Sequence, residues 1–216
     1  KKMRDFAKEN NIDFWEGKGV CHQVMMEHYV CPGELIFGAD SHTCSYGALG
    51  AFGTGVGCTD LLYGMVTGKS WVLVPETVKF NLVGKLPEGV YARDLILTII
   101  GTIGANGCNY QVMEFTGEGA KTLSISERMV LCNMAVEAGA KTGIFEPDEK
   151  AIEYLEAHGR KPKALFTSDP DAVYAREYTF DLSKIRPVVA KPDFVDNLVP
   201  AEEVRGVKID EAFLGS

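Results

Sequence analysis

Short β-rich runs and helical runs alternate along this chain, and the alternation constrains its fold more than any other feature. Strand-like runs lie at 35–39, 78–84, 110–117, 141–147 and 174–182, and helical patterns at 58–68, 92–104, 126–138 and 148–158. Ser124 and Glu127 have the spacing of a capping box, and Gly159 suits the left-handed residue after a helix. The alternation predicts an α/β protein.

Charge and hydropathy exclude several partners. The chain carries 30 Asp and Glu against 22 Lys and Arg, with no basic run, which argues against nucleic acid. Its longest apolar stretch, residues 95–104, is about half of the roughly 18 residues that a membrane-spanning helix requires. Because no N-terminal signal peptide is recognisable either, we expect a cytoplasmic protein without a membrane partner.

Proline and polar residues interrupt the pattern at 74–78 and 191–197. We therefore predict domain boundaries near residues 75 and 192. The six cysteines, none closer than ten residues to the next, contain no paired CxxC motif of a zinc or iron-sulfur site. In a chain with enough apolar residues for a core, we expect free thiols.

The helical pattern at 126–138 is apolar on every side after its first turn, which predicts a buried helix. Its polar members there are Asn133 and Glu137, which lie one turn apart on one face. A buried carboxylate needs a partner. Either a backbone amide or a nearby lysine such as Lys141 caps the Glu137 carboxylate, or Asn133 and Glu137 line a pocket.

Two histidines lie beside chain that we expect to face inward. His42 belongs to the run Asp40-Ser41-His42-Thr43, directly after the strand-like run at 35–39, and His22 lies in the sequence GVCHQVM. With Asp40 and Glu137 they make two possible histidine–carboxylate pairs, an arrangement that serves general acid catalysis.

Five glycines follow, at 47, 50, 53, 55 and 57. They match neither a dinucleotide fingerprint nor a P-loop, so we expect them to allow close packing of neighbouring elements instead.

The run FWEGKGVCHQVMMEHYVCPGELIFGADSHT at 14–43, the glycine-rich stretch after it and LCNMAVEAGAKTGIFEPDE at 131–149 resemble the aconitase superfamily of iron-sulfur hydro-lyases. Within it they are most similar to large subunits of the 3-isopropylmalate dehydratase and homoaconitase type, because Cys44 and Gly47 stand in a T-C-x-x-G motif. Tyr46 departs from the histidine common in the isopropylmalate enzymes. The substrate therefore stays open among isopropylmalate, homocitrate, citrate and dimethylmalate.

The resemblance implies an α/β fold of three-layer α/β/α subdomains, incomplete in this chain. Residues 1–75 would be the C-terminal part of the first domain, 76–192 the second domain, and 193–216 the start of the third. It also implies a reaction that moves a hydroxyl group of a 2-hydroxy di- or tricarboxylic acid through an alkene. One iron of a [4Fe-4S] cluster would act as the Lewis acid.

The resemblance assigns roles residue by residue. His22 with Asp40 and His42 with Glu137 would be the catalytic pairs, Ser41 would bind a substrate carboxylate, and Asn133 would lie against the cluster. The family's first cluster cysteine belongs to an FxGSCTN motif, and the chain stops at Ser216, one residue before it. We therefore expect a central fragment of a large subunit, inactive alone and without a cluster, whose partner is a small subunit carrying the swivelling domain.

Two other functions stay open at this point. The chain could be a mononuclear metal hydrolase with Asp40, His42, His22 and Glu137 as ligands, since these residue types suit zinc or iron. It could also be an assembly module without chemistry.

Overall fold

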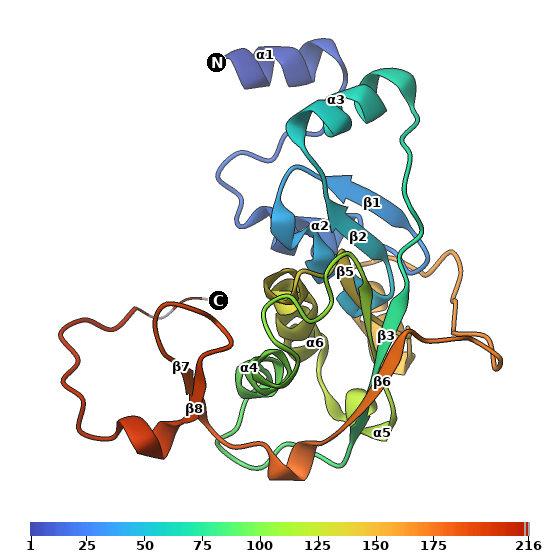
Figure 1. The fold of residues 1–216 in the computed structure, drawn as a ribbon. Helices are drawn as coiled ribbons and strands as arrows, with labels where there is room; N and C mark the ends of the chain where they lie inside the picture. The colour runs from blue at the N-terminus through green and yellow to red at the C-terminus, as the bar shows by residue number, and fades with distance from the viewer. Residues whose placement is uncertain (214, 216) are drawn as a thin grey trace.

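The computed structural model describes residues 1–213 and 215, and it is an α/β structure as predicted (Figure 1). A two-stranded parallel sheet pairs β1 (Leu35–Gly38) with β2 (Phe52–Gly55). A four-stranded parallel sheet has the order β5-β4-β3-β6. Its strands are β3 (Thr77–Val83), β4 (Val112–Thr116), β5 (Thr142–Phe145) and β6 (Arg176–Asp181). An antiparallel pair, β7 (Val188–Ala190) and β8 (Leu198–Pro200), packs against helix α4 (Ala92–Ile103).

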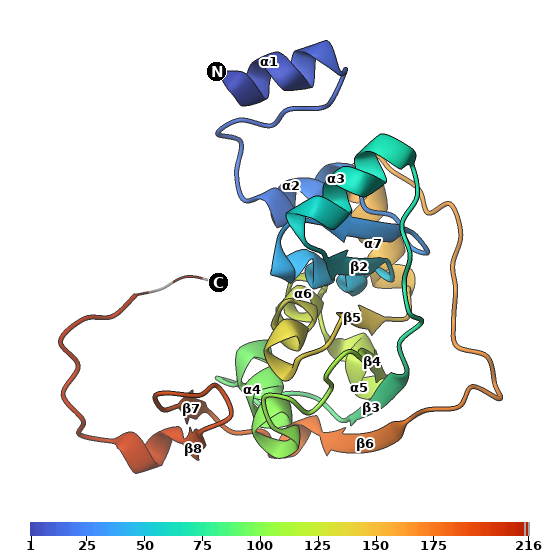
Figure 2. The ribbon, with the colours of Figure 1, turned by 45° about the horizontal axis from the view of Figure 1, so that its top comes forward.

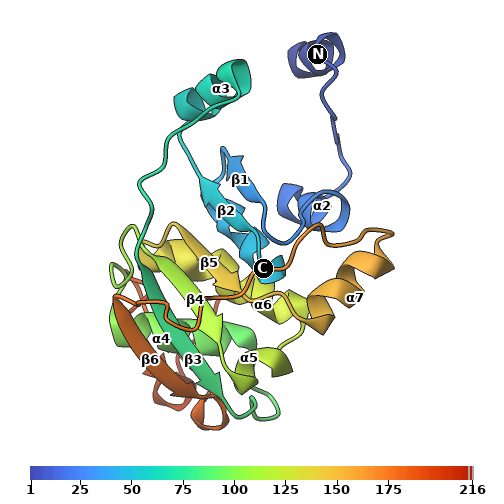
Figure 3. The same ribbon diagram turned by 90° about the vertical axis from the view of Figure 1, so that its right-hand side faces the viewer.

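Helices connect the strands. The α-helices are α1 (Lys2–Glu9), α2 (Cys21–His28), α3 (Cys58–Thr67), α4 (Ala92–Ile103), α5 (Glu118–Thr122), α6 (Ile125–Asn133) and α7 (Glu149–Ala157). Short 3₁₀ helices are η1 (Ser41–Leu49), η2 (Met134–Ala138), η3 (Leu182–Lys184) and η4 (Ala201–Val204). Figures 2 and 3 show α1 and α3 at the end of the molecule away from the four-stranded sheet. None of the described helices combines the length and apolarity needed to cross a membrane.

The four-stranded sheet forms because β3, β4 and β5 bury alternate or nearly continuous residues, while the edge strand β6 stays partly exposed. In β3, the side chains of Val78, Phe80 and Leu82 are fully buried while their neighbours are half-buried, which is the period of two expected of a strand. Aromatic rings also pack across the strands. The ring centroids of Phe80 and Phe115 are 5.6 Å apart in a tilted pair, and those of Phe115 and Phe145 are 5.1 Å apart in a stacked pair. Such pairs add to the stability that burial alone supplies.

One cluster of buried side chains contains residues from both sides of residue 75, among them Leu49 and Val78. The contact is direct, since η1 packs on β5 and α6. The domain divisions near residues 75 and 192 stay predictions.

The helix predicted at 126–138 differs from the structure in two respects. The α-helix begins at Ile125, with the capping box of Ser124 and Glu127 as predicted, but it ends at Asn133 and continues as the 3₁₀ helix η2. Nor is it buried on every side, because Met129 and Val130 are half-exposed. The most buried polar member is Arg128, whose guanidinium makes two hydrogen bonds to Asp148.

Candidate active site

The Asp40-Ser41-His42 run lies at the carboxyl end of β1, where parallel sheets commonly bind ligands. Asp40 is the N-cap of η1: its Oδ1 accepts a hydrogen bond from the backbone N of His42 at 2.7 Å. The hydroxyl of Thr43 donates to the carbonyl of Asp40 at 2.6 Å. These two bonds hold the tight turn that aims the three polar side chains out of the sheet edge.

The glycines after this run allow the close packing that the sequence predicted. A Cβ atom on Gly55 would lie 2.8 Å from the carbonyl oxygen of Asp40, and one on Gly53 would lie 3.0 Å from the ring of Tyr46. A Cβ on Gly47 would overlap the backbone of Gly143 in β5. Each glycine therefore lets η1 approach a neighbouring strand more closely than any side chain would permit.

His22 and Asp40 form the first histidine–carboxylate pair. His22 lies in the first turn of α2, and its Nε2 is 2.9 Å from Oδ1 of Asp40. The other ring nitrogen, Nδ1, is 3.2 Å from the hydroxyl of Tyr46. Only 14% of the His22 side chain is exposed, against 55% of Asp40. Both ring nitrogens thus have a protein partner.

His42 and Glu137 form the second pair. Nε2 of His42 lies 3.4 Å from Oε1 of Glu137, and Nδ1 lies 3.3 Å from the hydroxyl of Ser41. The second carboxylate oxygen of Glu137, Oε2, is buried and has no hydrogen-bond partner among the described residues. Lys141 does not neutralise it, because the Lys141 ammonium group lies over the ring of Tyr110.

Asn133 joins the end of α6 to η1. Its side-chain amide donates to the hydroxyl of Ser45 at 3.0 Å, and that hydroxyl donates to the carbonyl of His42 at 2.7 Å. The thiol of Cys44 donates to the carbonyl of Asn133 at 3.4 Å. The last turn of α6 therefore fixes the backbone that carries His42.

A pocket of about 440 Å³ adjoins this network. His22, Ser45 and Asn133 supply its polar wall, and Met129 and Val130 supply the apolar wall, which explains why these two residues of α6 are not buried. Of the predicted site residues, only His22 and Asn133 line this pocket. Hydrogen bonds join the others to them, so that α2, the turn after β1, the end of α6 and η2 all contribute to the network: Asp40, Ser41, His42 and Glu137. The volume is suited to a small organic ligand.

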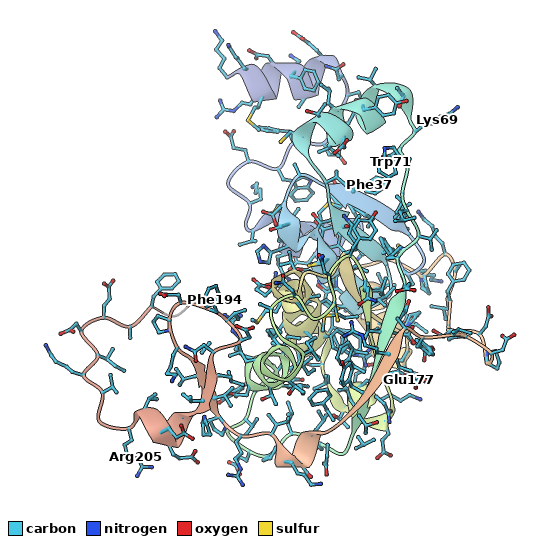
Figure 4. The ribbon with its side chains drawn as sticks, in the orientation of Figure 1. Phe37, Lys69, Trp71, Glu177, Phe194 and Arg205 are labelled. Carbon is cyan, nitrogen blue, oxygen red and sulfur yellow. The ribbon has the colours of Figure 1, made fainter. Side chains whose placement is uncertain are left out.

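A second pocket, of about 480 Å³, lies at the carboxyl ends of β4 and β5 and contains none of the predicted residues. Arg128 of α6 and Asp148, the N-cap of α7, are among its lining residues. A third pocket, of about 270 Å³, is lined by Phe37 of β1 and by Trp71 of the segment after α3, among others. Both residues are labelled in Figure 4.

The protonation states follow from the surroundings. The hydrogen bond from the His42 backbone, aided by the neighbouring imidazoles, lowers the pKa of Asp40, so this carboxylate is ionised at neutral pH. Burial raises the pKa of the Cys44 thiol to about 12 and raises the pKa of the Tyr46 hydroxyl as well, so both groups keep their protons.

All six cysteines are free thiols, as predicted. Within residues 1–213 and 215, no group of three or more His, Cys, Asp or Glu side chains is placed to hold a metal ion. The two histidine–carboxylate pairs are therefore hydrogen-bonded pairs, and their geometry does not support the metal-hydrolase alternative in which all four residues ligate one ion.

Sequence reasoning missed Ser45 and Tyr46 as members of the network. Both lie in the polar run that continues from His42, and that continuity was the available signal. The two remaining histidines, His28 and His158, are exposed.

The fold is α/β, and paired histidines and carboxylates gather at the end of a parallel strand. The chain belongs to the aconitase family, because the model of that family, described as aconitate hydratase, matches residues 1–213. Two relatives come from Methanothermobacter thermautotrophicus. One, 52% identical over 99% of this chain, is named a probable 3-isopropylmalate dehydratase large subunit, and the other, 49% identical over 99%, a probable methanogen homoaconitase large subunit. The 3-isopropylmalate dehydratase large subunit 1 of Methanopyrus kandleri is 50% identical over the whole chain. The chain spans about half the length of these relatives, 52%, 50% and 52% in the same order.

Proposed function

We propose that this chain carries part of the active site of a cytoplasmic hydro-lyase that removes and re-adds water on a 2-hydroxy di- or tricarboxylic acid such as 3-isopropylmalate. The observation that carries the proposal is the convergence of two histidine–carboxylate pairs, His22 with Asp40 and His42 with Glu137, from separate elements. The relatives' names, which cover isopropylmalate and homoaconitate chemistry, support the reaction class.

In this proposal the two imidazoles hold the proton that the leaving hydroxyl group needs. Loss of water to give an alkene requires that a C–O bond break, that the departing oxygen gain a proton, and that a base take a proton from the adjacent carbon. A histidine fixed by a carboxylate is suited to protonate the departing oxygen, and we propose that the base lies outside residues 1–216, on the partner subunit. Glu137 and Asp40 hold the rings and balance the positive charge of the imidazolium. Ser41, which is exposed beside His42, donates a hydrogen bond to a carboxylate of the substrate.

The resemblance also calls for a [4Fe-4S] cluster, which would supply Lewis-acid assistance to the departure of hydroxide. The donor set of this chain does not fit such a cluster: no group of three or more candidate ligands converges in the described residues, and Cys44 and Cys132 are buried thiols with a raised pKa. We propose that the ligands lie outside residues 1–216, that Asn133 faces the cluster in the whole protein, and that the 216-residue chain alone neither binds a cluster nor dehydrates a hydroxy acid. The relatives' designation as large subunits supports a small subunit as partner.

The test is a chimera. This chain replaces the matching half of the Methanothermobacter isopropylmalate dehydratase large subunit, which is 52% identical to it, and the chimera is produced anaerobically with that relative's small subunit. Formation of the alkene is followed by ultraviolet absorbance with isopropylmalate, homocitrate and citrate. We expect turnover of at least one of the three.

Several controls give the chimera its meaning. Substitution of His42 with Asn in the chimera should abolish turnover while the iron and sulfide content stays unchanged. The 216-residue chain, reconstituted with iron and sulfide, should stay colourless and inactive. A chimera that binds its cluster and turns over none of the three acids would favour the alternative of an assembly module. Stoichiometric zinc in the purified chain would favour the alternative of a metal hydrolase.

A further inference from the structure

Tyr46 is placed to control which nitrogen of His22 carries the proton. Its hydroxyl lies 3.2 Å from Nδ1 of His22, and the two rings meet edge to face with centroids 5.7 Å apart. Only 4% of the tyrosine is exposed. Among the described residues, Nδ1 of His22 is the one hydrogen-bond partner of this hydroxyl.

The direction of the hydrogen bonds follows from the two neighbours of His22. Asp40 is ionised at neutral pH, since its pKa is lowered by the bond from the His42 backbone, and an ionised carboxylate only accepts hydrogen bonds. The contact of 2.9 Å therefore requires the proton of a neutral His22 on Nε2. Nδ1 is then the acceptor, and the Tyr46 hydroxyl, which burial keeps protonated, is the donor.

We propose that Tyr46 is a positioning residue for His22: its hydroxyl donates to Nδ1 and, together with Asp40 on the other side of the ring, holds the tautomer that carries its proton on Nε2. The ring is thus clamped between a donor and an acceptor. The catalytic consequence of this clamp rests on the proposed function, but the tautomer itself is a property of the chain.

Gly53 of β2 packs directly against the Tyr46 side chain that contacts His22. A Cβ atom at Gly53 would lie 3.0 Å from Cδ2 of Tyr46 and 3.1 Å from its Cβ, closer than nearly all real contacts of a Cβ atom. The same Cβ atom would overlap the carbonyl oxygen of Thr43, so glycine on β2 lets the part of η1 that carries Tyr46 pack this closely. Other titratable groups near Tyr46 are Asp40 and the thiols of Cys21 and Cys44.

The first test reads the tautomer directly in the 216-residue chain. The chain is labelled with ¹⁵N-histidine, and the ring nitrogens of His22 are recorded by nuclear magnetic resonance at pH 8. We expect the proton on Nε2 and a hydrogen-bonded acceptor signal for Nδ1. In Y46F the Nδ1 signal should move to that of a free acceptor nitrogen, whereas in Y178F, which removes a hydroxyl on β6, it should stay in place.

A proton on Nδ1 in the unsubstituted chain would overturn the proposal, and this result does not depend on whether Y46F folds. An Nδ1 signal that Y46F leaves unchanged would overturn it as well.

The second test measures activity in the chimera. Loss of one hydrogen bond of roughly 0.5–1.5 kcal/mol corresponds to a fall of roughly 2- to 12-fold in kcat. We expect this fall in Y46F with KM unchanged, because the hydroxyl orients a proton-transfer group and binds no substrate. A change confined to KM would contradict the positioning role. If the unsubstituted chimera is inactive, the proposed function fails, and the tautomer measurement still decides the structural inference.

Discussion

The two histidine–carboxylate pairs differ in how completely the protein satisfies them. His22 is bonded on both ring nitrogens and is largely buried, and its partner Asp40 also caps η1. His42 is more exposed, its contact to Glu137 is longer at 3.4 Å, and Oε2 of Glu137 is buried without a partner in the described chain. A pair that is closed by protein contacts contributes to the fold, in addition to holding its imidazole for the proposed proton transfer. A pair that is left open keeps hydrogen-bonding capacity for a ligand.

The open pair should show the largest effect on activity. Substitution of Glu137 with Gln in the chimera removes the charge that supports His42, and we expect kcat to fall by roughly 10²- to 10⁴-fold, the usual value of a general acid or base. The free energy of unfolding should stay within about 0.5 kcal/mol or rise, because the amide removes the charge from a carboxylate whose buried Oε2 has no partner among the described residues.

Glu156→Gln, at an exposed position on α7, serves as the matched control and should keep full activity. Loss of stability in E137Q with full activity would reverse the comparison and make Glu137 a structural residue.

The second effect concerns Ser41, the exposed neighbour of His42. A hydrogen bond to a charged carboxylate is worth roughly 1.5–3 kcal/mol, so Ser41→Ala should lower kcat/KM of the chimera by roughly 10- to 150-fold, chiefly through KM. Steady-state kinetics with the preferred acid measures this. Ser70→Ala, on the segment after α3, is the control. An unchanged KM in Ser41→Ala would mean that the hydroxyl serves only to hold His42.

The third effect concerns the closed pair, and it should appear in stability. Asp40→Ala removes the N-cap of η1 together with the partner of His22, and caps of this kind contribute about 0.5–2 kcal/mol. Asp40→Asn keeps an acceptor at the cap, so it should lower the free energy of unfolding by only a few tenths of a kcal/mol. Urea denaturation of the 216-residue chain compares the two variants, and equal losses would show that charge, rather than capping, is what Asp40 contributes.

Much of this architecture was predictable from the sequence because it depends on local pattern. The strand at 78–84 follows from strict alternation, and the start of α6 follows from the capping box at Ser124 and Glu127. The residue types indicated two histidine–carboxylate pairs, but which histidine pairs with which carboxylate was predictable only through the family resemblance, since His42 and Glu137 lie far apart in the chain.

What the sequence did not predict depends on partners from other elements. Arg128 stands in an apolar helix, and its burial is possible only because Asp148 arrives from the turn before α7. The end of α6 at Asn133 is likewise a tertiary effect, since η2 tightens there while Cys44 bonds to the Asn133 carbonyl. In the sequence Tyr46 is notable only as a departure from the histidine of similar enzymes, and its hydrogen bond depends on α2, which places His22 against its hydroxyl.

The smallest effect is the pH dependence of the closed pair. The pKa of Asp40 is lowered in the folded chain, and the hydrogen bond from the His42 backbone is the largest cause. The pKa of an Asp in an unfolded chain is about 3.9. The unfolded chain therefore binds the proton more readily, so this contribution to stability is present above about pH 4 and is lost as the pH falls through the lower folded value. Because 55% of the Asp40 side chain is exposed, solvent screens the effect. Urea midpoints at pH 5 and pH 3 should fall less between these values in Asp40→Asn than in the unsubstituted chain, and equal falls would show that other carboxylates govern acid unfolding.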